Sequence, residues 1–404
     1  MVPLALFAAS GGGHGAEIPL AMLIVFGSAK LMAELFERMG QPGIVGEILA
    51  GVIVGPSVLG WIHPNEILTA LSELGVMFLL FRVGLEVKAS ELMKVGPVAS
   101  LVALLGVVVP FFMGWGIFVA AGYPQVESIF VGAAMVATSV GITAQVLAGK
   151  GLLHLAASKI ILGAAVIDDI LGLIVLAIVS SMARGTVNFL EIGTTALLAI
   201  GFTIVVAKWG TRTVARLLPA TKRLKAGEAQ FNLALVLLFA LSVLAIYAGV
   251  AAIIGAFLAG MALAESVNHR VHDLAHGITE LLVPFFLAGI GLHLDVSVFS
   301  NSTTLLLSVV ILVAAVLSKL VGCGLGAFRL GRAEMFRIGC GMVPRGEVGM
   351  VVAQIGMSMG IIEKPVYAVV VFMAVATTIV APALLNVAFR GVPAGLPAEE
   401  FQIG

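Results

Sequence analysis

The segment from Ile161 to Val179 reads Ile-Leu-Gly-Ala-Ala-Val-Ile-Asp-Asp-Ile-Leu-Gly-Leu-Ile-Val-Leu-Ala-Ile-Val, with Asp168 and Asp169 near its centre. This apolar run is long enough to cross the hydrocarbon core of a bilayer. One carboxylate at that depth is costly, and two adjacent carboxylates also repel each other. We therefore expect a cation, a proton or a basic partner to meet the charge. We interpret the pair as a site where cations and protons compete.

The composition of the whole chain is that of a polytopic membrane protein. Of its 404 residues, 60% are hydrophobic and 11% are charged, and the mean hydropathy is +1.16. A soluble domain of this length does not have such a balance. The net charge of zero gives no reason to expect a nucleic-acid partner. Cys323 and Cys340 both fall in apolar segments, so we expect free packing residues rather than a disulfide framework.

Hydropathy divides the chain into about thirteen apolar segments, which predicts an all-α membrane protein with about 13 transmembrane helices. The connections between the segments are short. We expect the spans at residues 17–38, 42–59, 66–84, 95–121, 125–149, 156–183, 189–217, 229–247, 249–266, 273–292, 302–328, 332–359 and 363–390.

The distribution of basic residues predicts the orientation of these spans. Thirteen spans place the two termini on opposite sides of the membrane. With the N-terminus outside, sixteen lysines and arginines lie on the inside, and only Arg184 and Lys364 lie outside. Cytoplasmic loops carry such an excess of basic residues. We therefore expect a multi-pass protein of the cell (inner) membrane with its C-terminus in the cytoplasm. The basic stretch Lys208–Lys225 can also contact anionic lipid.

The chain resembles itself at an offset of roughly 207 to 209 residues. Three matches in the same order predict two five-helix units, residues 42–183 and 249–390. Each unit contains an odd number of spans, and three further spans lie outside the units, which gives the two units opposite orientations. Inverted repeats are typical of secondary transporters, although glycine-rich apolar helices also resemble one another by composition alone. The matches pair Val45–Gly51 with Ile254–Gly260, Glu73-Leu74 and Gly84-Leu85 with Glu280-Leu281 and Gly291-Leu292, and Met135-Val136 with Met342-Val343.

Two spans contain sequences that interrupt a helix. Residues 137–143 read Ala-Thr-Ser-Val-Gly-Ile-Thr, and residues 343–349 read Val-Pro-Arg-Gly-Glu-Val-Gly. Proline removes a backbone donor, and glycine and β-branched residues weaken a helix. We expect two broken helices that cross at the midplane, because free backbone groups are tolerated there only where they line a polar cavity.

The remaining deep charges complete a candidate ion site. Lys319 has no acidic neighbour in its own segment, and an aspartate at equal depth is the obvious partner. Carboxylate, hydroxyl and carbonyl oxygens at the helix breaks suit a dehydrated monovalent cation, which then competes with protons. The alternative is a structural ion pair of Asp168 with Lys319 and a solvated Asp169. We expect Arg345 and Glu347 to compensate the dipoles of the broken helices or to bridge the broken segments.

With these residues in view, the chain resembles the monovalent cation:proton antiporter family 2, nearest to the NapA-type sodium/proton antiporters. The resemblance covers nearly the whole chain and implies an NhaA-like antiporter fold. It rests on Gln41-Pro42, Gly46–Gly51, Gly55-Pro56-Ser57, Ala137–Thr143, Ala165–Asp169, Lys319 and Pro344–Glu347.

The resemblance also implies a homodimer in which a dimer domain supports a mobile six-helix core domain, with elevator-like alternating access. Residues 1–94 then form an N-terminal tail and the first part of the dimer domain, and residues 229–301 form its second part. The core domain comprises residues 95–183 and residues 302–404, which include a short C-terminal tail. Residues 184–228 form a linker helix and a basic cytoplasmic loop. Since the chain ends about 14 residues after its last span, we expect no cytosolic nucleotide-binding domain.

By the same resemblance, Asp169 is the main ligand of both cation and proton. Asp168 pairs with Lys319 and releases it when the cation binds. Thr138 and Ser139 line the crossing, and Pro344, Arg345 and Glu347 support it. A lysine at position 319 resembles the electrogenic members of the family.

The function expected from these residues is exchange of Na+ or Li+ for H+, with no enzyme activity and no cofactor. Exchange of K+ for H+ on the same scaffold remains an alternative, since the sequence does not define the size of the cation cavity. A sodium-coupled symporter for an organic anion and an ion channel are further alternatives. Paired acids with a lysine favour saturable, pH-coupled exchange over both.

Overall fold

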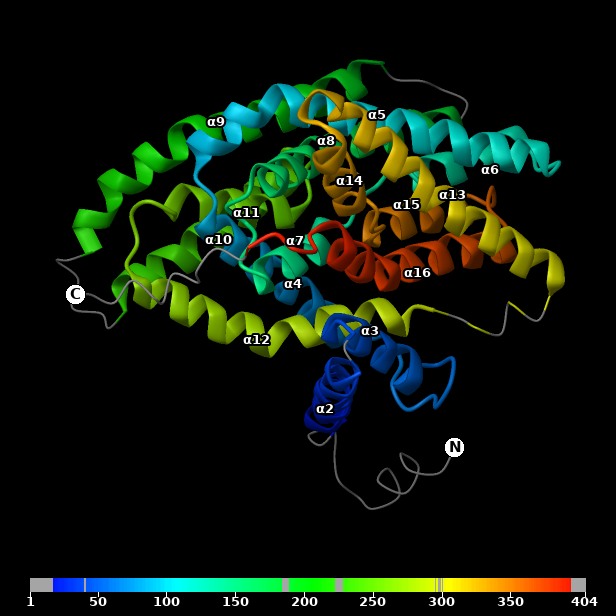
Figure 1. The fold of residues 1–404 in the computed structure, drawn as a ribbon, viewed down its shortest axis with the longest axis horizontal. Helices are drawn as coiled ribbons and strands as arrows, with labels where there is room; N and C mark the ends of the chain where they lie inside the picture. Colours follow the sequence, from blue (N-terminus) through cyan, green and yellow to red (C-terminus); the bar gives the residue numbers. More distant parts are fainter. Residues whose placement is uncertain are drawn as a thin grey trace.

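The computed structural model describes residues 17–39, 41–183, 189–221, 228–294, 296, 299 and 301–393. Helices account for the regular structure of these residues (Figure 1). The first half of the chain forms α2 (Glu17–Arg38), α3 (Gly43–Val54), α4 (Glu66–Glu86), α5 (Ala89–Ala120), α6 (Gln125–Ala134), α7 (Val140–Gly149) and α8 (Ala156–Ala183). After α9 (Phe189–Thr221), the second half forms α10 (Ala229–Tyr247), α11 (Ala252–Leu263), α12 (His269–Leu292), α13 (Ser302–Gly326), a 3-10 turn (Phe328–Leu330), α14 (Arg332–Gly341), α15 (Glu347–Ser358) and α16 (Lys364–Ala388).

Within the described residues, eight helices are long and apolar enough to cross a bilayer: α2, α4, α5, α8, α10, α12, α13 and α16. Helix α9 bends by 43° between two apolar parts and would be a ninth. Helices α3, α7 and α11 and most of α15 are apolar but have only 10–17 residues. The prediction of an all-α membrane protein is confirmed, whereas the number of thirteen crossings stays a prediction.

Both spans with helix-breaking sequences are interrupted at the expected places. Helix α6 ends at Ala134 and α7 begins at Val140, while α14 ends at Gly341 and α15 begins at Glu347. The two interruptions lie against each other, because the backbone N–H of Ser139 donates to the carbonyl oxygen of Pro344 at 2.8 Å. Four short helices thus meet at one place in the interior.

Two groups of helices pack around this meeting point. Helices α2, α3, α4, α10, α11 and α12 contact one another, with α4 lying between α11 and α12. Helix α5 packs along α8 and α13, and α16 packs along α13, α14 and α15. In Figure 1, α2, α3 and α12 occupy the lower part of the view, α5 runs along its top, and α16 lies between them. The assignment of the two groups to moving and fixed domains stays a prediction.

Glycines allow helix backbones to touch, and the same contacts recur in both halves of the chain at the offset of about 207 to 209 residues. At each of these glycines a Cβ atom would overlap a carbonyl group of the neighbouring helix. The recurring contacts pair Gly46–Met32 with Gly255–Leu241, Gly51–Ala288 with Gly260–Phe81, Gly84–Phe257 with Gly291–Ile48, and Gly132–Phe111 with Gly339–Leu320. The first pair involves α2 and α10, which lie outside the five-helix units expected from the sequence.

Candidate ion-binding site

Lys319 on α13 and Asp168 on α8 form a buried ion pair. The Nζ atom of Lys319 lies 3.1 Å from Oδ1 and 3.3 Å from Oδ2 of Asp168. Their side chains are 0% and 1% exposed. Removing both charges from water is costly, so each group depends on the other for compensation. The structure thus places in contact the two charges that the sequence put at equal depth, and the part of this pair in transport stays a prediction.

Asp169 follows on the same helix and is partly buried. Successive residues of an α-helix point about 100° apart. The carboxylate of Asp169 therefore leaves α8 in a different direction from that of Asp168, which faces Lys319. The two aspartates are adjacent in the chain but face different surroundings, so they can take different roles.

The interruption between α6 and α7 carries the hydroxyl groups expected at the crossing. Ser139 is 4% exposed and Thr138 is partly buried. The Oγ1 atom of Thr138 is buried and has no hydrogen-bond partner among the described residues. A buried hydroxyl oxygen without a partner is a potential ligand for a cation. Gly346 lets the other interruption approach, because a Cβ atom there would lie 2.7 Å from the Cβ of Ser139.

Arg345 closes the C-terminal end of α6. Its Nη1 atom donates to the carbonyl oxygens of Met135, Val136 (3.2 Å) and Ala137 (3.5 Å). The last carbonyl groups of a helix have no partners within the helix, and they carry the negative end of its dipole. A buried guanidinium with several donors in one plane suits these oxygens.

The same guanidinium group also reaches α13. Its Nη2 atom donates to the carbonyl oxygen of Ala315 at 3.0 Å and to Oγ of Ser318 at 3.3 Å. Ser318 directly precedes Lys319 in the chain. Arg345 therefore fixes the end of α6 against the helix that carries the lysine of the ion pair.

The second interruption is held by hydroxyl groups of its neighbours. The Oγ1 atom of Thr143 on α7 donates to the carbonyl oxygen of Gly341 at the end of α14, at 2.6 Å. The backbone N–H of Arg345 donates to Oγ1 of Thr377 on α16 at 3.1 Å. Glu347 is the first residue of α15, and its side chain lies outside the part that the structure describes. The expected electrostatic role of Glu347 therefore stays a prediction.

Gly106 on α5 is part of this site, although the sequence analysis does not identify it. A Cβ atom at this position would lie 2.7 Å from Sγ of Cys323, 3.3 Å from Nζ of Lys319 and 3.8 Å from Oδ1 of Asp168. The glycine therefore leaves the space that the ion pair occupies. Gly116 on the same helix has no atom within 4 Å of an added Cβ. The sequence carries no signal that separates these two glycines, since both lie in apolar surroundings.

A polar cavity of about 610 Å³ lies between α2, α3 and α12 on one side and α7 and α16 on the other. The carboxylates of Glu34, Glu37, Glu47 and Glu280 line it, together with the amino groups of Lys30 and Lys150. Glu47 is 5% exposed, and its Oε1 atom lies 3.0 Å from Nζ of Lys30. In the structure Glu47 lines the cavity as a paired, buried acid, and the excess of carboxylates gives the cavity a potential that attracts cations.

The model of the sodium/hydrogen exchanger family, a transmembrane family, matches residues 21–391. The chain belongs to this family. The result confirms the resemblance to cation:proton antiporters that the sequence motifs indicated. The members of this family are multi-pass membrane transporters and not enzymes.

Individual relatives of this exchanger agree with the family assignment. The chain is 33% identical over 381 residues to the Na+/H+-K+ antiporter GerN of Bacillus cereus. The alignment covers 92% of this chain and 96% of GerN. The chain is 34% identical over 423 residues to the high-affinity Na+/H+ antiporter NhaS3 of Synechocystis sp., with 93% and 90% covered. The solved structure of the sodium proton antiporter MjNhaP1 from Methanocaldococcus jannaschii superposes with a TM-score of 0.66 at 18% identity, covering 93% of this chain and 98% of that one. This last likeness shows that the two chains share a fold.

We expect Gly106→Ala to lower the free energy of unfolding by about 1 to 3 kcal/mol, because the added methyl group displaces Cys323 or the Lys319–Asp168 pair. Thermal unfolding of the purified protein in detergent measures the change. Gly116→Ala is the matched control on the same helix. We expect it to be neutral or stabilising by about 0.5 to 1 kcal/mol, since glycine weakens a helix interior. Equal effects of the two substitutions would contradict the role given to Gly106.

We expect Lys319→Gln to destabilise the protein by about 3 to 5 kcal/mol, because it leaves the Asp168 carboxylate buried without its cation. The double variant Lys319→Gln/Asp168→Asn should lose less than the sum of the two single variants, since it removes both charges. Melting temperatures of all four proteins give the coupling, and Lys364→Gln at the exposed start of α16 is the control. Additive losses would show that the ion pair contributes no coupling energy.

Proposed function

We propose that this protein is a secondary antiporter that exchanges Na+, or Li+, for H+. The observation that carries the proposal is the pair of aspartates on α8 beside two interrupted helices, with Asp168 held by Lys319 and an unpaired hydroxyl oxygen on Thr138. Membership of the sodium/hydrogen exchanger family supports cation/proton antiport in general. The names of the relatives GerN and NhaS3 support Na+ as a transported ion.

Competition for carboxylates couples the two ions in this proposal. Asp169 is the main ligand and carries either a cation or a proton. Hydroxyl and carbonyl oxygens of Thr138 and Ser139 supply further ligands. A monovalent cation that also engages Asp168 takes the carboxylate away from Lys319. The buried ammonium then has no partner and releases its proton. One cation thus replaces more than one proton, and the exchange is electrogenic.

Alternating access follows from the two groups of helices. The polar cavity separates α2, α3 and α12 from α7 and α16. We infer that the core, residues 95–183 and 302–404, moves past a dimer domain formed by residues 1–94 and 229–301, with residues 184–228 as the linker. The recurring glycine contacts support inverted repeats, and the contacts of α2 and α10 favour including these helices in the units.

The basic residues support an orientation in the inner membrane with the N-terminus outside and the C-terminus in the cytoplasm. In this orientation Lys150 is cytoplasmic, so the acidic cavity opens toward the cytoplasm. The homodimer follows from the family resemblance, and a contact of anionic lipid with the basic stretch Lys208–Lys225 remains part of the proposal. Lys222, Arg223 and Lys225 of that stretch lie outside the described residues.

Exchange of K+ for H+ is the second candidate, and it is favoured by the name of GerN, which includes both Na+ and K+. A sodium-coupled organic-anion symporter needs a pocket that attracts anions. The polar cavity has four carboxylates and two amino groups, so its negative groups outnumber its positive groups and its potential repels anions. A channel has no need of titratable groups that are consumed and regenerated in each cycle.

Proton movement in proteoliposomes with an imposed pH gradient tests the antiport proposal. We expect Na+ or Li+, but not choline, to dissipate the gradient, because the cation displaces protons from the carboxylates. Asp169→Asn should abolish the response while leaving a folded protein. The control is Glu66→Gln, which removes an exposed carboxylate at the start of α4. A response to K+ alone would transfer the assignment to the second candidate. Full exchange by Asp169→Asn would contradict the role of Asp169.

Current recordings on a supported membrane test the coupling role of Lys319. We expect a transient current when Na+ is added to the wild type, because unequal numbers of charges cross in each direction. In Lys319→Gln the current should fall more than the rate of Na+ uptake, since one titrating group is lost. A ratio of current to uptake equal to that of the wild type would show that Lys319 does not carry a proton.

A further inference from the structure

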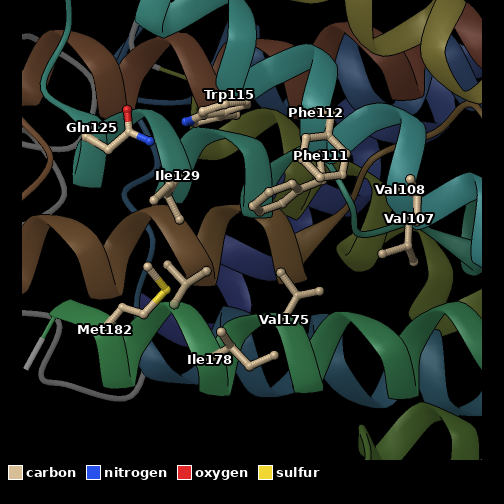
Figure 2. Close-up of a pocket in the computed structure, with 11 residues that line it drawn as sticks. Val107, Val108, Phe111, Phe112, Trp115, Gln125, Ile129, Val175, Ile178 and Met182 are labelled. Atoms are coloured by element: carbon tan, nitrogen blue, oxygen red, sulfur yellow. The ribbon is translucent and has the colours of Figure 1, made fainter. Parts of the chain in front are cut away.

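A second cavity, of about 420 Å³, lies between α5, α6 and α8 (Figure 2). Its wall is made of aliphatic and aromatic side chains, among them Val107, Phe111, Ile129 and Val175. No charged side chain is among its described lining residues. The cavity is separate from the acidic cavity near α2 and α3, and the proposed antiport mechanism makes no use of it.

The opening of this cavity faces the hydrocarbon of the membrane. Val108, Phe112 and Met182 line it and are 38%, 57% and 45% exposed. They lie on α5 and α8, which are long and apolar enough to span the bilayer. Water in a cavity needs two to four polar partners, which the aliphatic and aromatic part of this wall does not offer. The molecule that fills the space is therefore apolar along most of its length.

One end of the cavity differs from the rest, because it contains two polar groups. The indole Nε1 of Trp115 is buried and has no hydrogen-bond partner among the described residues. Figure 2 shows the nitrogen edge of Trp115 turned toward the side-chain amide of Gln125. A buried N–H donor without an acceptor is unfavourable in apolar surroundings. An acceptor oxygen of a bound molecule at this end of the cavity would satisfy the donor.

The polar end lies at the level of the membrane interface. Gln125 is the first residue of α6, and Trp115 lies about a turn and a half before the end of α5. The two helices are joined by a short loop at that end. Tryptophan is enriched at the interface, where its ring contacts hydrocarbon and its N–H reaches polar groups. In a phospholipid, the ester carbonyl oxygens lie at this depth and the acyl chains extend inward from them.

We propose that this cavity is a phospholipid-binding site. An ester carbonyl oxygen accepts from Nε1 of Trp115, and one acyl chain extends between α5 and α8 toward Val107. Recognition is by the acyl chain and the ester group. Because the wall carries no basic residue, the site does not distinguish anionic from zwitterionic headgroups.

The inner end of the cavity is close to the ion pair. Val107 follows Gly106, whose added Cβ would lie 3.3 Å from Nζ of Lys319. Val175 lies about two turns after Asp168 on α8. A bound acyl chain therefore packs against both helices that enclose Asp168 and Lys319, and it fills space that would otherwise weaken their contact.

Native mass spectrometry of the purified protein in detergent tests the site. We expect the wild type to retain phospholipid through delipidation, with phosphatidylethanolamine and phosphatidylglycerol retained equally. Val175→Phe and Ile178→Phe fill the cavity and should abolish retention. Trp115→Phe keeps the ring but removes the donor, and should weaken binding about fivefold. Leu104→Phe, at an exposed position on α5 outside the cavity, is the matched control. Retention unchanged by the filling substitutions, or retention of detergent alone, would overturn the proposal.

Tryptophan fluorescence in proteoliposomes provides a test that needs no substitution in the cavity. Trp61→Phe/Trp209→Phe leaves Trp115 as the only tryptophan of the chain. We expect phospholipid brominated near the ester group to quench Trp115 more strongly than phospholipid brominated at the chain end. Trp115 fluorescence that is insensitive to both lipids would show that protein, such as a second copy of the chain, covers the cavity, and would overturn the proposal.

Discussion

The interior of this protein depends on the hydrogen bonds that Arg345 donates to the backbone carbonyl groups of the interruption after α6. A helix that ends inside a membrane protein leaves carbonyl groups without partners, and the surrounding hydrocarbon cannot supply any. The guanidinium of Arg345 donates to three carbonyls just beyond the end of α6, those of Met135, Val136 and Ala137, and also to α13. Its own charge is balanced by the negative end of the helix dipole. Ser139 and Pro344 can therefore meet at depth, and a polar place exists where the aspartates of α8 can act.

The ion pair of Lys319 with Asp168 is a second compensation of the same kind, but it differs in one respect. The carbonyl groups that hold Arg345 cannot take up or release protons, whereas both members of the ion pair can. The first arrangement is therefore permanent, whereas in the proposed mechanism a competing cation opens the second. Gly106 belongs to the second arrangement, because a Cβ atom there would press on Cys323 and would lie close to the ammonium of Lys319. In the proposed mechanism, stability and exchange thus use neighbouring groups of one cluster, with the titratable groups placed at the end that faces α5.

Much of this arrangement is predictable from the sequence because buried charges and helix breakers are conspicuous in apolar segments. Asp168, Lys319, Pro344 and Arg345 stand out for that reason, and both helix interruptions occur where they were expected. The partners of Arg345 were not predictable, since Met135 and Ala315 contribute only backbone oxygens that every residue possesses. Gly106 could not be told from other glycines in the sequence, because its role depends on contact with side chains of two helices that are distant in the chain. The number of thirteen crossings stays a prediction, since α3 and α11 are shorter than a bilayer span.

The recurring glycine contacts have a further consequence for the origin of the scaffold. Gly51 meets the helix of Ala288, and its counterpart Gly260 meets the helix of Phe81, the counterpart of Ala288. Each patch therefore contacts the equivalent of its own partner, which is the rule for an isologous interface between identical subunits. A half-length ancestor inserted in both orientations could form the same contacts as an antiparallel dimer. In such a dimer every substitution appears in both subunits. Asp168 and Asp169 correspond to Thr377 and Thr378 at the repeat offset, and a dimer of identical subunits could not carry aspartates at one of these places and threonines at the other. Fusion of two such copies into one chain would remove that constraint and would allow charge to be placed on one side only.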